Sequence, residues 1–234
     1  MLYYINEFRK SGVIMIWAIS DIHGMYENLI SLLKKIKDND KIIFLGDYVD
    51  RGPDSKKVLD LLIVLSKAGK HVFLKGNHDD MLVDYYRKTH DYDDGVWFYN
   101  GAITTIKSFE NKVENEYVEF LERLPLFYEE KIGRYNYLFV HAGVNPGKPL
   151  SVQNRWDFLW IREEFLYMET KYENYIILHG HTPTLYLNGS DKIIMRKDKN
   201  NELISIDIDT GCVYGGKLTA LGITEDNKYV VLQA

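Results

Sequence analysis

The chain has one cysteine and no long hydrophobic run, and both absences narrow what it can be. Cys212 stands alone among 234 residues, so no disulfide can form within the chain and the fold has no need of an oxidising compartment. The longest apolar stretch, residues 13–19, is far shorter than the ~20 residues needed to cross a bilayer, and no signal-peptide pattern is found. We therefore expect a cytoplasmic protein with no membrane partner.

Clustered positive charge is missing as well. The sequence has 29 Lys and Arg against 34 Asp and Glu, a formal charge of −5, so we expect no nucleic-acid partner. With 46% hydrophobic residues the chain can bury a substantial core, and no repeat or linker divides it. We expect a single domain over residues 1–234, in which 1–14 form a peripheral, dispensable extension. The oligomeric state stays open, and a monomer is compatible with the sequence.

Helical and extended patterns alternate in the first third of the chain. Strands are expected at 13–20, 41–45 and 71–74, with amphipathic helices at 26–36 and 55–68 between them. Such alternation predicts a parallel sheet with right-handed crossovers, and ligand groups at the carboxyl ends of its strands.

The rest of the chain changes character. Residues 79–123 are predicted to be helical and to contain a cap at 91–109, where Trp97, Phe98 and Tyr99 either pack in the core or stack a base. Strands at 135–140 and 175–178 flank a helix at 151–165. Four period-two strands at 193–197, 203–208, 217–223 and 229–232 then suggest a second, mixed or antiparallel sheet. The fold class is α/β: a sandwich of mixed sheets flanked by helices, with a small helical cap.

Five short polar clusters each follow a predicted strand. They are Asp21-Ile22-His23, the segment 46–52 (GDYVDRG), Gly76-Asn77-His78-Asp79, His141-Ala142-Gly143 and Gly180-His181-Thr182-Pro183. Carboxylate, imidazole and amide donors delivered from several strand ends can converge on two divalent ions. Such an ion pair can hold both the attacking and the leaving oxygen of a displacement at phosphorus.

Six residues are candidate metal ligands. Asp21 and His23 can face one ion, and Asp47 can bridge two because Gly46 lets the backbone approach closely. Asn77 offers oxygen without another charge. His141 and His181 each end a strand, as single imidazole ligands of the second ion would, whereas the spacing does not decide whether His179 or His181 faces the metals. The ordinary alternatives are helix caps and surface histidines.

Five further residues are candidates for contact with the substrate or for its chemistry. His78 has the intrinsic pKa of a general acid near neutrality, and Asp50 can orient it. The planar guanidinium of Arg51 suits phosphate oxygens. Arg162 either contacts phosphate or pairs with a neighbouring acid such as Glu163. Tyr214, in a Gly-rich loop, either reaches the site or packs as a lid.

These motifs resemble the phosphoprotein phosphatase family of metallophosphoesterases, especially its bacterial serine/threonine phosphatase branch. The similarity runs from Trp17 to Leu221 and is most specific in residues 47–52 (DYVDRG) and in Gly76-Asn77-His78. Two positions depart from the usual pattern without removing a ligand: Ser20 stands where glycine is usual before the first Asp, and Asp79 where many relatives carry Glu.

The resemblance implies a metallophosphatase sandwich with a dinuclear centre. Asp21, His23 and Asp47 would hold one ion; Asp47, Asn77, His141 and His181 would hold the other; Arg51 and Arg162 would bind phosphate; and His78, supported by Asp50, would donate a proton. Manganese is the family expectation, with iron or zinc as alternatives.

The expected reaction is hydrolysis of a phosphomonoester by a hydroxide that bridges the two ions, without a phosphoenzyme. The leading substrate is phosphoserine or phosphothreonine in a protein. The enzymatic alternative is symmetrical hydrolysis of diadenosine tetraphosphate to ADP, and a remote one is a noncatalytic phosphate-binding protein.

Overall fold

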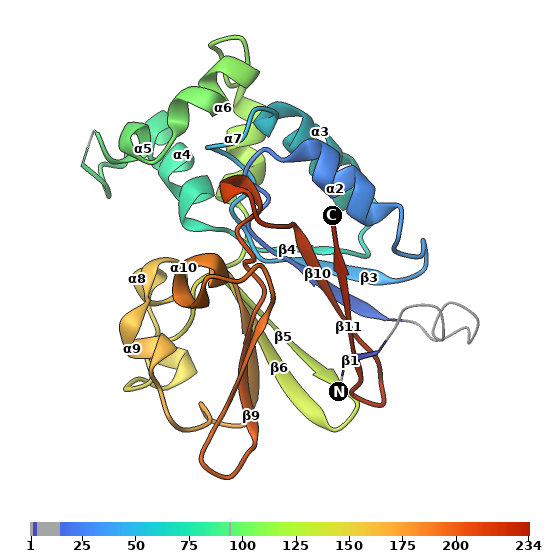
Figure 1. The fold of residues 1–234 in the computed structure, drawn as a ribbon. Coiled ribbons are helices and arrows are strands. Elements are labelled where there is room, and N and C mark those ends of the chain that lie inside the picture. The colour runs from blue at the N-terminus through green and yellow to red at the C-terminus, as the bar shows by residue number, and fades with distance from the viewer. Residues whose placement is uncertain (1, 4–14, 94) are drawn as a thin grey trace.

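Two mixed β-sheets stack face to face and are flanked by helices (Figure 1). The structure is a computed structural model, and it describes residues 2–3, 15–93 and 95–234. The first sheet has the order β1-β11-β10-β2-β3-β4 and the second β5-β6-β7-β9-β8. The predicted sandwich of mixed sheets is confirmed.

The first sheet contains the alternating strands expected from the sequence. β2 (Ile16–Ile19), β3 (Lys41–Phe44) and β4 (Val72–Phe73) run parallel. Antiparallel β10 (Thr219–Ile223) and β11 (Tyr229–Gln233) extend the sheet, and β1 (Leu2–Tyr3) pairs with β11 at the edge. Apart from Leu2 and Tyr3, the expected 1–14 extension lies outside the described residues.

The second sheet shows two differences from the sequence-based expectation. It consists of β5 (Phe127–Ile132), β6 (Tyr135–Val140), β7 (Tyr175–His179), β8 (Ile194–Lys197) and β9 (Leu203–Asp207). The four C-terminal strands do not form a sheet of their own, because only β8 and β9 join this one. β5 was not predicted: its Glu129, Glu130 and Lys131 dilute the apolar pattern, although the strand pairs with β6 along its whole length.

The helices cover the outer faces and one end of the sandwich (Figure 1). α2 (Tyr26–Leu33) and α3 (Ser55–Ser66) pack on the first sheet. The helical region expected at 79–123 consists of α4 (Asn77–Arg87), α5 (Val96–Tyr99), α6 (Ala102–Ser108) and α7 (Asn115–Glu122), of which α5 and α6 lie in the cap expected at 91–109. Near the second sheet lie the 3-10 helix η1 (Leu150–Val152), α8 (Arg155–Trp160), α9 (Glu163–Leu166) and α10 (Thr184–Asn188). A 3-10 helix, η2 (Cys212–Tyr214), precedes β10.

Three apolar layers hold these elements together. Ala18, Ile43 and Leu45 of the first sheet meet Phe139 and Leu178 of the second. Alternate residues such as Trp17 and Phe44 point instead to the helices. Because the central strands are buried on both faces, their sequences read as continuous apolar runs, and the polar residues that follow are held at the rim of a rigid sandwich.

The predicted helix at 151–165 is broken at Ile161 and Arg162. Ile161 has extended dihedrals (φ −59°, ψ 140°), and Arg162 has φ −131° and ψ −88°. The Arg162 guanidinium donates to Thr182 Oγ1 at 2.8 Å and to the His181 carbonyl at 3.3 Å. The break therefore turns Arg162 toward the strand-end clusters.

Within the described part of the chain, no helix has the length and apolar character needed to cross a membrane.

Candidate active site

All five polar clusters meet at one rim of the sandwich. The backbone N–H of Asp21 donates to the Gly46 carbonyl at 3.2 Å, and that of His23 to the Asp47 carbonyl at 2.9 Å. From the other sheet, the Gly180 N–H donates to the His141 carbonyl at 2.8 Å. The clusters from both sheets are therefore neighbours although they are up to 160 residues apart, as between Asp21 and His181.

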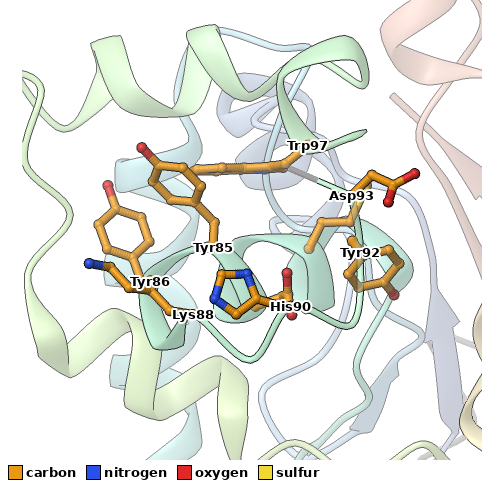
Figure 2. Close-up of a pocket in the computed structure, with 9 residues that line it drawn as sticks. Tyr85, Tyr86, Lys88, His90, Tyr92, Asp93 and Trp97 are labelled. Atoms are coloured by element: carbon orange, nitrogen blue, oxygen red, sulfur yellow. The ribbon is translucent and has the colours of Figure 1, made fainter. Parts of the chain in front are cut away.

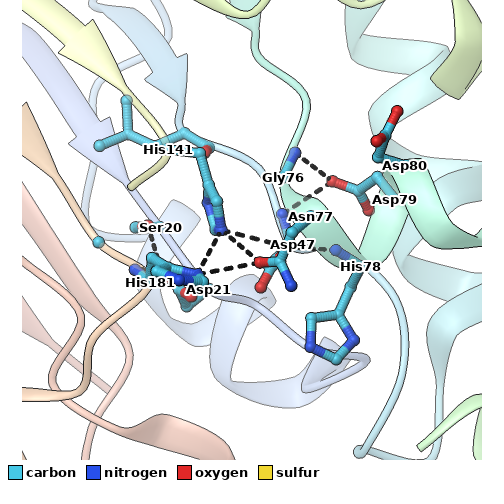
Figure 3. A network of polar contacts seen from close by, with 12 residues as sticks. Ser20, Asp21, Asp47, Gly76, Asn77, His78, Asp79, Asp80, His141 and His181 are labelled. Carbon is cyan, nitrogen blue, oxygen red and sulfur yellow. Dashed lines mark hydrogen bonds and ion pairs between the residues drawn. The ribbon is translucent and has the colours of Figure 1, made fainter. Parts of the chain in front are cut away.

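Four donor atoms converge on one point between the sheets (Figure 3). His141 Nε2 lies 2.9 Å from Asn77 Oδ1, 3.2 Å from His181 Nδ1 and 3.5 Å from Asp47 Oδ1. His181 Nδ1 lies 3.0 Å from the same Asn77 oxygen. His141 Nδ1–H donates to the Leu45 carbonyl at 3.1 Å, which leaves the Nε2 lone pair pointing at the other donors.

A second group of donors lies next to the first and shares Asp47 with it. His23 Nε2 is 3.3 Å from Asp47 Oδ2 and 4.0 Å from Asp21 Oδ1. His23 Nδ1–H donates to the Val49 carbonyl at 2.8 Å, so this Nε2 also presents a lone pair. In each of two sets of residues, the potential ligand atoms all lie within 4.8 Å of one another. One set is His23, Asp47 and His78, and the other is Asp47, His141 and His181.

Burial keeps the histidines of the site neutral, as metal ligands are, and disfavours the negative charge on Asp47. Burial lowers the pKa values of His23, His141 and His181, which keeps their imidazoles neutral. Burial, and then repulsion from Asp21, raises the pKa of Asp47 well above its usual range. Neutral nitrogens and crowded carboxylate oxygens fit divalent cations, which would relieve that repulsion. The residues present thus fit a dinuclear divalent metal centre.

The loops that carry these groups have unusual backbone conformations. Asp21, His23, Asp47, Asp50, Arg51 and His181 all have φ between 44° and 70°, in the left-handed region that non-glycine residues seldom adopt. Each such residue costs of order 1 kcal/mol or more and persists only where the surroundings enforce it. The fold holds the site loops in place against this local preference.

Two glycines let the loops approach one another. Gly46 has φ of 100°, and a Cβ there would lie 2.3 Å from the Gly76 nitrogen. A Cβ on Gly180 would lie 2.1 Å from Asp21 Oδ2, the oxygen that accepts the His181 N–H at 3.0 Å. Larger residues would push apart the loops that carry Asp21 and Asp47.

His78 is held by a buried carboxylate beside the donor groups. Its Nδ1 lies 2.7 Å from Asp50 Oδ2. Asp50 also accepts from Thr105 Oγ1 at 2.7 Å and from Trp97 Nε1 at 2.9 Å. His78 Nε2 is buried and has no hydrogen-bond partner among the described residues. Burial raises the pKa of Asp50 to about 7, against the effect of the bonds from Thr105 and Trp97.

The two arginines flank the donor groups. Arg51 Nη1 lies 2.7 Å from His23 Nε2, and its guanidinium stacks over the Tyr214 ring at 5.4 Å. Burial lowers the pKa of Arg162, while the nearby Asp21 and Asp47 act in the opposite direction. Arg162 donates to Thr182 at the edge of the site, and its contact with phosphate stays a prediction.

Several supporting residues were missed or left open by the sequence. Asp79, which stands where many relatives carry Glu, accepts from the backbone N–H groups of Gly76, Asp47 and Tyr48 at 2.8–3.0 Å and so ties two ligand loops together. His179 faces away from the donors: its ring packs on Phe165 at 4.8 Å.

The cap aromatics divide between core and surface. Trp97 is core, as the structural alternative predicted, and its indole N–H binds Asp50, whereas Tyr99 is exposed. Trp97 also borders a cavity of about 530 Å³, whose further walls include Tyr85, Tyr86 and Tyr92 (Figure 2). No sequence signal linked Trp97 and Thr105 to Asp50, because their separations in the chain are 47 and 55 residues.

Known proteins are similar to this chain in sequence and in fold. A sequence model described as calcineurin-like phosphoesterase matches residues 14–201. An asymmetrical bis(5'-nucleosyl)-tetraphosphatase PrpE of Oceanobacillus iheyensis is 28% identical, with 88% of each chain covered. Serine/threonine-protein phosphatase 1 of Salmonella typhimurium is also 28% identical, over 87% of this chain and 89% of the relative. A crystal structure of a putative diadenosine tetraphosphatase superposes with a TM-score of 0.65 at 20% identity, covering 96% and 95% of the two chains.

Proposed function

The chain belongs to the calcineurin-like phosphoesterase family, and on this premise we propose that it cleaves a dinucleoside polyphosphate at a dinuclear metal site. The observation that carries the chemistry is the sharing of Asp47 by two adjacent groups of buried donors. The substrate class is supported by relatives named asymmetrical bis(5'-nucleosyl)-tetraphosphatase that match over most of both chains. Their names favour asymmetrical cleavage over the symmetrical cleavage to ADP considered from the sequence.

We assign the metal ligands as the sequence predicted. Asp21, His23 and Asp47 would hold one ion, and Asp47, Asn77, His141 and His181 the other. Bound divalent ions supply an activated water and neutralise charge on the phosphate. Manganese remains the expected metal, with iron or zinc as alternatives.

The remaining side chains would bind the substrate and move a proton. Arg51 and Arg162 would bind the nonbridging oxygens of the phosphate under attack, because a guanidinium matches their geometry. His78 Nε2 would give its proton to the departing oxygen as the phosphorus–oxygen bond breaks, while Asp50 holds Nδ1–H. Water adds to the phosphorus and the leaving group departs protonated, so no residue is modified.

Phosphoserine and phosphothreonine phosphatase activity is the second candidate. It is favoured by the Salmonella relative, which matches at the same identity as the PrpE protein. The metal chemistry would be the same for both substrates, since in each a water attacks a phosphorus whose leaving oxygen needs a proton.

A single comparison tests both functions. The protein, supplied with Mn²⁺, is given diadenosine tetraphosphate, phosphoserine and phosphothreonine peptides and p-nitrophenyl phosphate, with Asp47→Asn as the inactive control. We expect ATP and AMP as products and at least a 100-fold preference in kcat/KM for the dinucleotide, or about 2.7 kcal/mol. A preference of that size for the peptides would favour the second candidate, and two molecules of ADP would indicate symmetrical cleavage. Unchanged p-nitrophenyl phosphate turnover in Asp47→Asn would contradict the metal site.

A further inference from the structure

Two exposed tyrosines lie together beside the site. Tyr186 of α10 is 65% exposed and Tyr214 of η2 is 38% exposed. Their ring centroids are 5.2 Å apart, and the ring planes are inclined by 52°. Large apolar side chains that stay exposed next to a reaction centre are candidates for ligand contact. We refer to Tyr186 and Tyr214 as the tyrosine shelf.

The tyrosine shelf is joined to the donor groups through Arg51. The Arg51 guanidinium lies 5.4 Å from the centroid of the Tyr214 ring, and its Nη1 lies 2.7 Å from His23 Nε2. The chain of contacts thus runs from His23 through the arginine to an aromatic surface. If Arg51 holds a phosphate of the substrate, the group esterified to that phosphate would lie next to these two rings.

Hydrogen bonds within the backbone hold the loop and the helix that carry the tyrosine shelf. Gly211 (φ 73°) and Gly215 (φ 90°) bracket η2, and the N–H groups of Tyr214 and Gly216 both donate to the Gly211 carbonyl at 2.9 Å. The Thr184 N–H donates to the Asp209 carbonyl at 2.8 Å, which fastens the start of α10 to the same loop. A ligand would therefore meet a preformed surface and would not have to order it.

We propose that the tyrosine shelf stacks one nucleobase of a dinucleoside polyphosphate whose phosphate is held by Arg51. This inference rests on the proposed function and adds the part of the substrate that the metal site does not contact. Every nucleobase offers an aromatic face, and stacking on a protein ring tolerates different bases. A phosphoserine side chain has no ring to place there, so the shelf would distinguish the two candidate substrates.

A second aromatic surface, the cavity beside α4, is the competing place for a base. It contains Tyr85 and Trp97, but Trp97 is buried and its indole N–H is committed to Asp50 (Figure 2). Tyr186 is more exposed than Tyr85, at 65% against 43%, and the tyrosine shelf contacts Arg51 directly. We therefore assign the base to the shelf, and a Tyr85→Ala variant tests the cavity.

The test compares inhibitors with and without a base. ATP and inorganic tripolyphosphate are used as inhibitors of p-nitrophenyl phosphate hydrolysis by the Mn²⁺-loaded full chain, and the ratio of their inhibition constants is measured. In the unsubstituted protein we expect ATP to inhibit more strongly than tripolyphosphate. In Tyr186→Ala this advantage should fall about 10-fold, the size expected for one stacked base, and in Tyr186→Phe it should persist.

Matched variants separate the alternatives. Tyr167→Ala removes an exposed tyrosine that directly follows α9 and should keep the ATP advantage. An unchanged advantage in Tyr186→Ala, or its loss in Tyr85→Ala alone, would overturn the shelf.

Failure of the proposed function would give a different experimental result from failure of the tyrosine shelf. If diadenosine tetraphosphate is not cleaved by the unsubstituted protein, the substrate assignment fails, while the ratio of inhibition constants still decides whether a base binds at Tyr186.

Discussion

His78 Nδ1 and Asp50 Oδ2 lie 2.7 Å apart in a contact that is closed to solvent. The carboxylate fixes which imidazole nitrogen carries a hydrogen toward it, so Nε2 is the atom left for the substrate. Trp97 and Thr105 hold the carboxylate in turn. This arrangement links the helical cap to the chemistry of the site.

Replacing His78 should slow the reaction in a way that depends on the leaving group. We expect His78→Asn to lower kcat for phenyl phosphate about 100-fold to 10,000-fold, because phenolate needs a proton as it departs. The loss should be much smaller for p-nitrophenyl phosphate, whose leaving group is stable without one. Steady-state kinetics on the two esters measures the difference. Asp50→Asn should show the same dependence more weakly; equal losses on both esters would instead indicate a structural role.

Divalent metal should stabilise the fold through Asp47. A ligand present at 100 times its Kd adds about 2.7 kcal/mol, which for a chain of this size corresponds to a rise in Tm of roughly 5–10 °C. Thermal unfolding with EDTA and with Mn²⁺ should show this rise. In Asp47→Asn the shift should fall below half, because both donor groups lose their shared carboxylate. Glu202→Gln, an exposed change in the turn between β8 and β9, is the control and should respond like the unsubstituted protein.

A methyl group at position 180 should damage the site more than the fold. In Gly180→Ala the new Cβ would meet Ser20 Oγ at 2.0 Å and Asp21 Oδ2 at 2.1 Å, so the Asp21 carboxylate must move. We expect kcat/KM for p-nitrophenyl phosphate to fall at least 10-fold and the bound metal, measured by elemental analysis, to fall below two ions per chain. The matched change Gly95→Ala meets no described atom within 4 Å and should leave both quantities unchanged. Full metal content with full activity in Gly180→Ala would contradict the role of Asp21.

The sequence predicted most accurately those features that depend on a single local pattern of residues. The strand at 135–140 was predicted with its observed bounds because its aromatic and aliphatic residues end in an unbroken run, Tyr137 to Val140, directly before His141. The metal-ligand candidates could be found because each cluster of potential donor side chains directly follows a predicted strand. What failed were features set by distant partners, such as the break after Trp160, which depends on Arg162 reaching Thr182. The division of the last four strands between two sheets likewise depends on pairing that local periodicity does not encode.

The site showed the same division. Candidate ligands were apparent from residue type, whereas the choice between His179 and His181 depends on the three-dimensional structure. The His181 ring turns toward Asn77, with Nδ1 3.0 Å from Asn77 Oδ1. The left-handed backbone of His23, Arg51 and His181 had no sequence signal, since such conformations are expected mainly of Gly, Asn and Asp. Tertiary contacts enforce them, and these contacts join residues far apart in the chain.

The buried carboxylate of Asp40 should be important for stability alone. Its two oxygens accept from the Trp17 indole N–H at 2.8 Å and from the Met15 backbone N–H at 3.0 Å, at the start of the strand that leads to Asp21. Asp40→Ala would leave both buried donors without a partner, at a cost of about 2–4 kcal/mol in the free energy of unfolding. Urea denaturation followed by tryptophan fluorescence measures this loss, with the exposed Asp38→Ala as control. Because Asp40 touches no site residue, kcat of the folded variant should stay within twofold, and a larger fall would show that β2 transmits the change to the ligand loop.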